Sequence, residues 1–161
     1  MRSNTMLGMY AALYGVSAVV LRASNPFGPR QGRLGVQGLV ASFLSRVHAG
    51  EPLRIWGDGT VVRDYFYVTD LAQLCALAAE SGETGVFNAG SGQGTSIDRV
   101  VELIRETTGR ELSAIYEPQR QFDVQATYLD ITRARDVFGW RPEVGLAEGI
   151  RLHWAWLQET T

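Results

Sequence analysis

Two short apolar runs constrain the fold of this chain more than any other feature. Residues 17–24 (SAVVLRAS) and 85–90 (GVFNAG) consist mostly of apolar or small residues, and the first run is rich in β-branched side chains. Such runs are typical of strands buried on both faces of a parallel sheet. Two strands do not make a stable sheet by themselves. We therefore expect them to extend a sheet whose other strands lie upstream of this sequence.

Segments with helical spacing alternate with the apolar runs, and this alternation predicts an α/β fold. Several of these segments stop at a glycine, the residue that most often closes a helix. Thr95 is the expected start of one helix, with Asp98 in a capping-box position three residues later. The expected helices are 4–14, 36–49, 70–80, 95–108, 132–138 and 145–158, and shorter strands are expected at 53–56, around 61–68 and at 113–116.

The composition describes an ordinary globular chain of 161 residues, about the size of one domain, so we treat 1–161 as a single domain. A net charge of -2 gives no reason to expect a nucleic-acid or anionic-membrane partner. No apolar run is long enough to span a bilayer. Cys75 is the single cysteine, which excludes an internal disulfide and is typical of the reducing cytoplasm, where we expect the protein. The basic residues are all arginine, which binds phosphate through a planar fork.

Two segments in the first half contain side chains suited to a nucleotide. Asn25 follows the first apolar run, where α/β proteins commonly bind ligands, although asparagine before proline is also a common turn former. Trp56 either stacks on a base or packs in the core. Arg63 either forms a surface ion pair with Asp64 or points towards a diphosphate while Asp64 helps to fix it.

Two segments in the second half are ambiguous by themselves. The glycines of residues 90–98 do not have the spacing of a dinucleotide-binding loop, so we interpret this segment as a strand-to-helix connection. In residues 116–130, Arg120 could bind phosphate, and Asp123 could accept hydrogen bonds from two ribose hydroxyls. A solvated loop is the alternative for this stretch.

The remaining reactive side chains are interpreted as structural. His48 and His153 have no metal-ligand spacing to other histidines, cysteines or carboxylates. Cys75 lies on an apolar helix face and is expected in the core.

Taken together and in order, these segments resemble the extended short-chain dehydrogenase/reductase family. The resemblance is to its NAD-dependent nucleotide-sugar epimerases and dehydratases, and most of all to the UDP-glucose 4-epimerase branch. Order and spacing match across nearly all 161 residues. The matching runs are LRASNPFGPRQ, GEPLRIWGDGTVVRDYFYVTDLA, GVFNAGSGQGTSI, the pair Arg120-x-x-Asp123, and FGWRPEVGLAEGI.

The resemblance implies that an upstream Rossmann part holds NAD, and that this chain is the substrate-binding C-terminal part whose two long strands complete the Rossmann sheet. Arg54 departs from the family pattern, in which a small polar or aromatic residue is more usual at this position. The implied roles are Ser24 and Asn25 beside the nicotinamide, Asn25 also beside the substrate diphosphate, Leu39 and Phe43 against the base, Arg54 and Trp56 around uracil and ribose, Arg63 and Arg120 on the diphosphate, and Asp123 on a ribose hydroxyl.

The catalytic groups of the family fall outside the matching runs. When the family is aligned on Tyr10, its catalytic tyrosine precedes Met1 and its lysine position is Asn4. We therefore expect no catalytic residue, no tightly bound NAD and no epimerase activity in this chain alone. The expected partner is a nucleotide sugar, and exposed strand edges predict a homodimer or other self-association. The alternatives are a fragment of a nucleotide-sugar 4,6-dehydratase or decarboxylase, and a non-catalytic sugar-nucleotide-binding module.

Overall fold

The computed structural model describes residues 2–31, 38–119 and 123–160. Its helices are α1 (Arg2–Tyr14), α2 (Leu39–Ala49), α3 (Val68–Glu80), α4 (Ile97–Thr108), α5 (Thr132–Phe138) and α6 (Leu146–Glu159). Its strands are β1 (Val19–Ala23), β2 (Asn25–Phe27), β3 (Leu53–Trp56), β4 (Val62–Arg63), β5 (Tyr65–Tyr67), β6 (Gly85–Ala89), β7 (Thr95–Ser96), β8 (Ala114–Glu117) and β9 (Ala126–Thr127). None of the helices described could cross a membrane, since none is both long and apolar enough.

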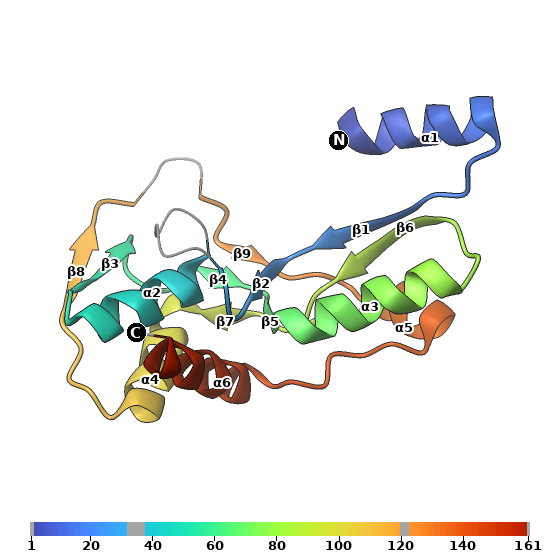
Figure 1. The fold of residues 1–161 in the computed structure, drawn as a ribbon. Coiled ribbons are helices and arrows are strands. Elements are labelled where there is room, and N and C mark those ends of the chain that lie inside the picture. Colours follow the sequence, from blue (N-terminus) through green and yellow to red (C-terminus); the bar gives the residue numbers. More distant parts are fainter. Residues whose placement is uncertain (1, 32–37, 120–122, 161) are drawn as a thin grey trace.

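The two apolar runs form β1 and β6, which lie side by side and pair in parallel as predicted (Figure 1). Their register runs from Val19 opposite Gly85 to Ala23 opposite Ala89. Helix α3 packs on β1, and α5 packs on β6. A small apolar core fills the space between these elements, and its fully buried members are Phe66, Leu74, Phe87, Ala89, Ala134 and Trp140.

Three further small sheets lie outside the β1–β6 pair. Strands β2 and β5 pair in parallel, as do β3 and β8, while β4 lies between antiparallel β7 and parallel β9. The single strand expected around 61–68 is therefore wrong in detail, because β4 and β5 belong to different sheets. Asp64 stands between them, fully buried, and its hydrogen bonds to other segments interrupt the strand.

The larger core lies where α2, α4 and α6 pack together against β3 and β5. Helix α4 begins one residue after Ser96, whose side-chain oxygen accepts a hydrogen bond from the Arg99 amide at 3.2 Å. Ser96 is thus the N-cap, and the expected start at Thr95 is wrong because Thr95 pairs in β7. Gly109 ends the helix in the left-handed conformation, as predicted. The most buried residues of this core are Val40, Leu44, Leu53, Ile55, Val100, Ile104 and Ile150.

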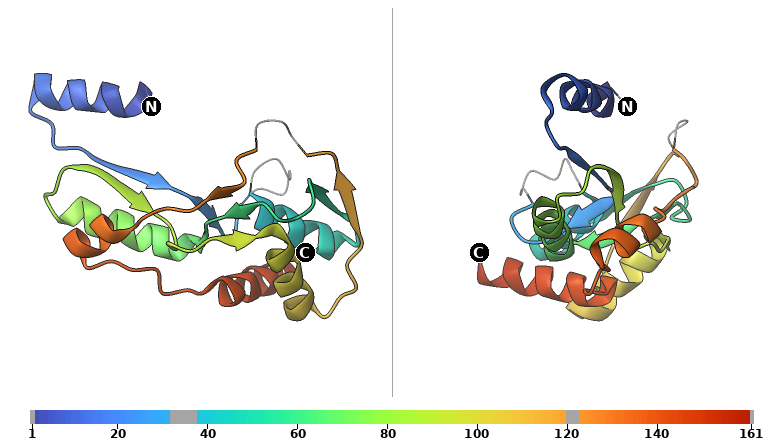
Figure 2. Two further views of the ribbon diagram at one scale, coloured as in Figure 1. Left: turned by 180° about the vertical axis from the view of Figure 1, so that it is seen from behind. Right: turned by 90° about the vertical axis from the view of Figure 1, so that its right-hand side faces the viewer.

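Helix α1 precedes β1 and stands away from the rest of the molecule, and the two views in Figure 2 agree on this. Its large apolar side chains that the structure describes are exposed: Leu13 has 70% of its surface accessible and Met9 has 58%. The helix itself was predicted, but the structure described here provides no core for its apolar face. Cys75 on α3 is also exposed, so its expected place in the core is wrong.

Candidate functional site

A pocket of about 200 Å³ lies where β2, β3 and β4 meet the first residues of α2 and α4. Its residues come from distant parts of the sequence, and six of them are residues singled out from the sequence as nucleotide ligands. Those six are Asn25, Leu39, Arg54, Trp56, Arg63 and Asp123; the other four are Ile55, Val61, Tyr65 and Ile97.

The floor of the pocket is apolar and buried. Ile55, Val61, Tyr65 and Ile97 are each at most 7% exposed and belong to the larger core. These four were not predicted as pocket residues. In a sequence, an apolar residue that faces a ligand has the same pattern as one that packs only against its neighbours. An apolar floor of this kind suits the face of a base or a ribose.

Strand β3 supplies one wall through its outward side chains. Leu53 and Ile55 are buried, while Arg54 and Trp56 alternate with them and are exposed, which is the two-residue period of a strand. Trp56 is 41% exposed, so it is not the core residue that one interpretation allowed. The Arg54 guanidinium is 4.0 Å from the Glu117 carboxylate on β8, at the outer limit of an ion pair.

Arg63 supplies positive charge at the pocket from β4. Its Nη1 donates to the Val124 carbonyl at 2.6 Å and to its neighbour Val62 at 2.8 Å. No ion pair joins Arg63 to Asp64 in the described structure, so that interpretation of the pair is wrong. Asp64 does not hold the Arg63 guanidinium either, because its carboxylate faces other donors.

The Asp64 carboxylate is completely buried and accepts four hydrogen bonds. Its Oδ1 accepts from the amide and the hydroxyl of Ser91, at 2.7 and 2.6 Å. Its Oδ2 accepts from the amides of Leu129 and Gly92, at 3.1 and 3.3 Å. A buried carboxylate requires such compensation, since burying it without partners would be very unfavourable.

Tyr65, one of the pocket residues, has a buried hydroxyl that the sequence interpretation overlooked. Its OH is buried and has no hydrogen-bond partner among the residues described. Burial raises the pKa of the phenol to about 12, although the nearby charge of Arg63 opposes this shift. The hydroxyl therefore stays protonated near neutral pH and remains able to donate a hydrogen bond.

Two of the residues singled out from the sequence lie elsewhere in the structure, and a third is not among the described residues. Phe43 is 3% exposed and packs in the larger core, without lining the pocket. Ser24 does not line the pocket; its Oγ is buried at the end of β1 without a partner in the described structure. Arg120 lies outside the described residues. Asn25, which does line the pocket, donates from Nδ2 to the Asp64 carbonyl at 2.9 Å.

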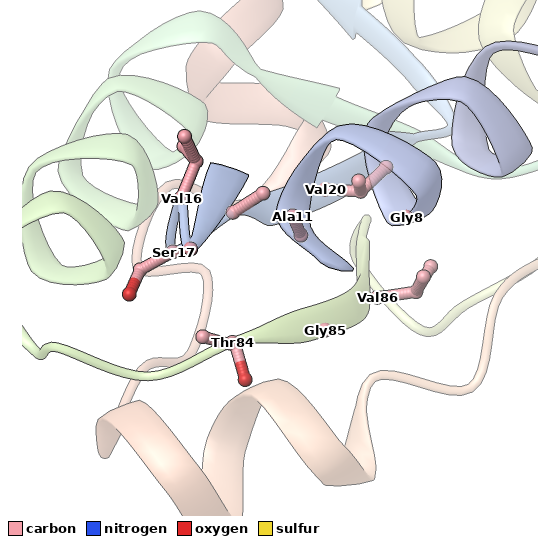
Figure 3. Close-up of a pocket in the computed structure, with 10 residues that line it drawn as sticks. Gly8, Ala11, Val16, Ser17, Val20, Thr84, Gly85 and Val86 are labelled. Atoms are coloured by element: carbon pink, nitrogen blue, oxygen red, sulfur yellow. The ribbon is translucent and has the colours of Figure 1, made fainter. Parts of the chain in front are cut away.

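A larger hollow of about 440 Å³ lies between α1, β1 and β6 (Figure 3). Its described lining consists of glycine, alanine, valine, serine and threonine, none of which has a titratable side chain. None of these described side chains could hold a charged ligand by ion pairing, so the smaller pocket at Arg63 is the better candidate for a nucleotide.

The histidines behave as structural residues, as expected. His153 is 1% exposed, and burial lowers the pKa of its imidazole to about 4. His48 packs edge-on against Trp154. Within residues 2–31, 38–119 and 123–160, no cluster of histidine, cysteine and carboxylate side chains could hold a metal ion.

Comparison with known proteins assigns the chain to a family. The sequence model of the "NAD dependent epimerase/dehydratase family" matches residues 2–90. A UDP-glucose 4-epimerase from Mycolicibacterium smegmatis is 38% identical over 145 residues, which make up 89% of this chain and 46% of the relative. The chain spans about half the length of the curated relatives it matches.

Two solved structures are similar throughout the chain. The UDP-glucose 4-epimerase of Thermotoga maritima, solved with UDP-glucose, superimposes with a TM-score of 0.94 at 40% identity, covering 99% of this chain and 52% of that one. The UDP-glucose 4-epimerase of Thermus thermophilus, solved with NAD, gives a TM-score of 0.90 at 36% identity, covering 98% and 51%. The α/β fold expected from the sequence is that of half of such an enzyme.

Proposed function

Since the chain belongs to the NAD-dependent epimerase/dehydratase family, we propose that it is the nucleotide-sugar-binding half of a UDP-glucose 4-epimerase-like enzyme. The observation that carries this proposal is the pocket at Arg63, which gathers six residues chosen from four separated sequence segments. The chemistry of the whole pocket matches the parts of a nucleoside diphosphate: the apolar floor and Trp56 suit the base, and Arg63 suits the diphosphate.

The size of the pocket limits what it would enclose. About 200 Å³ lies below the roughly 300–1,000 Å³ typical of small-molecule sites. We therefore assign it the base, ribose and part of the diphosphate, with Asp123 on the ribose hydroxyls. The sugar would extend from this pocket towards Asn25, just past the carboxyl end of β1, where parallel-sheet proteins commonly bind ligands.

NAD is the cofactor that the family implies, and Ser24 fits one edge of it. The buried Ser24 Oγ without a partner could hydrogen-bond a carboxamide, and Asn25 is the next residue. When bound, NAD accepts a hydride from the sugar and returns it. In this proposal Ser24 and Asn25 orient only the nicotinamide end, while the pocket at Arg63 anchors the nucleotide and so positions the reacting carbon.

Titration calorimetry with UDP and a panel of nucleotide sugars tests the proposal. We expect weak, saturable binding of UDP, and a Kd about tenfold higher or more for Arg63→Ala, because a charged hydrogen bond contributes roughly 1.5–3 kcal/mol. Arg151→Ala is the matched control, since Arg151 lies on α6 in an exposed pair with Glu148. Equal affinities for the two variants, or no UDP binding at all, would contradict the proposal.

A turnover assay separates the proposal from its rivals. We expect no conversion of UDP-galactose by the purified chain, because the family's catalytic lysine position is Asn4. Turnover would require catalytic groups that we do not recognise in this chain. Preferential binding of a different nucleotide would favour the dehydratase alternative over an epimerase.

A further inference from the structure

Asp64 contacts, or is adjacent in sequence to, the segments that bring Asn25, Arg63 and Asp123 to the pocket, yet it does not line the pocket itself. Its position between β4 and β5 makes it the neighbour of Arg63 on one side and of Tyr65 on the other. It is fully buried, so solvent contributes nothing to the stabilisation of its carboxylate.

The main chain of Asp64 orients Asn25. Its carbonyl accepts hydrogen bonds from both the Asn25 amide, at 3.1 Å, and Asn25 Nδ2, at 2.9 Å. One residue therefore fixes both the backbone and the side chain of Asn25.

The side chain of Asp64 holds the segment that follows Asp123. Its Oδ2 accepts from the Leu129 amide, while Arg63 donates to the Val124 carbonyl five residues earlier. Between these two points, β9 pairs with β4. The stretch that carries Asp123 is thus attached to β4 and Asp64 at three successive places.

The same carboxylate binds the loop after β6 through Ser91 and Gly92. Gly90 allows this close approach, because a Cβ there would collide with Asp64 Oδ2 and lie 2.9 Å from Ser24 Oγ. The Asp64 carboxylate and Gly90 therefore depend on each other: the absence of a side chain at Gly90 lets the loop after β6 pack directly against the carboxylate.

We infer that Asp64 is a positioning residue for the pocket, acting through Arg63, Asn25 and the segment 123–129 without touching the ligand. This inference rests on the proposed function of the pocket. Its physical basis is that a buried carboxylate with four donors has a single favourable geometry, and that geometry aligns the strand bearing Arg63 with the segment bearing Asp123.

Asp70 provides a matched control elsewhere in the molecule. It is 3% exposed and also accepts from two main-chain amides, those of Glu143 and Val144, at 3.1 and 3.3 Å. It contacts neither the pocket nor the segment 123–129 in the described structure. Asp64→Asn and Asp70→Asn each weaken a buried carboxylate network, so the comparison shows whether weakening such a network away from the pocket is enough to weaken binding.

The experiment measures the Kd for UDP by calorimetry for the whole chain and both variants, at a temperature where circular dichroism shows each to be folded. We expect Asp64→Asn to raise the Kd at least tenfold and Asp70→Asn to change it less than twofold. We also expect the ratio of the Kd values at high and low NaCl to shrink in Asp64→Asn, because a displaced Arg63 charge contributes less to binding.

Ser91→Ala is the milder second variant, since it removes one of the four hydrogen bonds and leaves the three main-chain donors. We expect it to raise the Kd two- to fivefold, and it decides the question if Asp64→Asn does not fold. Unchanged affinity in Ser91→Ala, or equal effects of the Asp64 and Asp70 variants, would overturn the inference while leaving the proposed function in place. An unmodified chain that does not bind UDP would overturn both.

Discussion

The two ends of the molecule differ in how they accommodate apolar and charged side chains. At the pocket end, α2, α4 and α6 cover their apolar residues, and Leu44 is completely buried. At the α1 end, Leu13 is 70% exposed and Tyr14 is 69% exposed. The pocket end also carries charged residues beside its cavity, whereas no titratable residue is among the described residues that line the hollow at the α1 end.

This difference suggests that ligand binding and association belong to different ends of the molecule. The pocket end has the packing and the hydrogen-bonded carboxylate needed to hold a polar ligand in a defined geometry. The α1 end exposes several large apolar side chains, and exposed apolar surfaces usually mark places of association. Ligand binding should therefore depend on the first region and association on the second.

The largest expected effect comes from a pair of leucine substitutions. Leu44→Ala should lower the free energy of unfolding by about 2–5 kcal/mol, because it leaves a cavity in the core under the pocket. Leu13→Ala should change it by less than about 0.5 kcal/mol, because the side chain is exposed. Urea denaturation of both variants measures the difference; similar losses would mean that α1 packs against something in solution.

A smaller effect is expected for association. The double variant Met9→Glu and Leu13→Glu places two negative charges on the exposed face of α1. If this face drives self-association, the dissociation constant for self-association of the chain should rise about tenfold or more in the double variant, while the Kd for UDP stays the same. Sedimentation velocity over a concentration series measures the first quantity. A chain that is monomeric at high concentration without any substitution would contradict the expectation.

The smallest effect concerns pH. His153 has a pKa of about 4 in the folded chain against an ordinary value near 6.5, because burial disfavours its charged form. The unfolded chain therefore binds the proton more readily, and stability is lost as the pH falls from about 6.5 towards 4. We expect a loss of about 1 kcal/mol between pH 7 and 5.5.

His153→Leu should remove this part of the pH dependence in urea denaturation at the two pH values. A variant lacking residues 2–14 should retain it, since His153 lies on α6 in the core at the other end. An equal pH dependence in His153→Leu and the unmodified chain would show that other groups cause it.

The sequence predicted the elements that local patterns determine. The apolar runs became β1 and β6, and Gly109 and Gly139 end their helices with positive φ. The two-residue strands were not predictable, because β4, β7 and β9 exist only through pairing between distant segments. The interruption at Asp64 was missed for the same reason: its four donors come from residues 91–129.

The candidate site was anticipated mainly through resemblance to a family, and local spacing alone left each residue ambiguous. The structure brings Arg54, Arg63 and Asp123 to one pocket, but leaves Phe43 in the core. It also adds Tyr65, which the sequence presented as an ordinary strand residue. A buried hydroxyl without a partner becomes visible only when its surroundings are known.

An NMR titration of the ¹⁵N-labelled chain with UDP tests most directly whether the charged pocket, and not the apolar hollow, binds the ligand. The account predicts saturable amide shifts concentrated in β3, β4 and residues 123–127, with none in α1 or residues 84–86. Shifts concentrated around residues 15–20 and 84–86 would contradict it, as would the absence of any saturable shift.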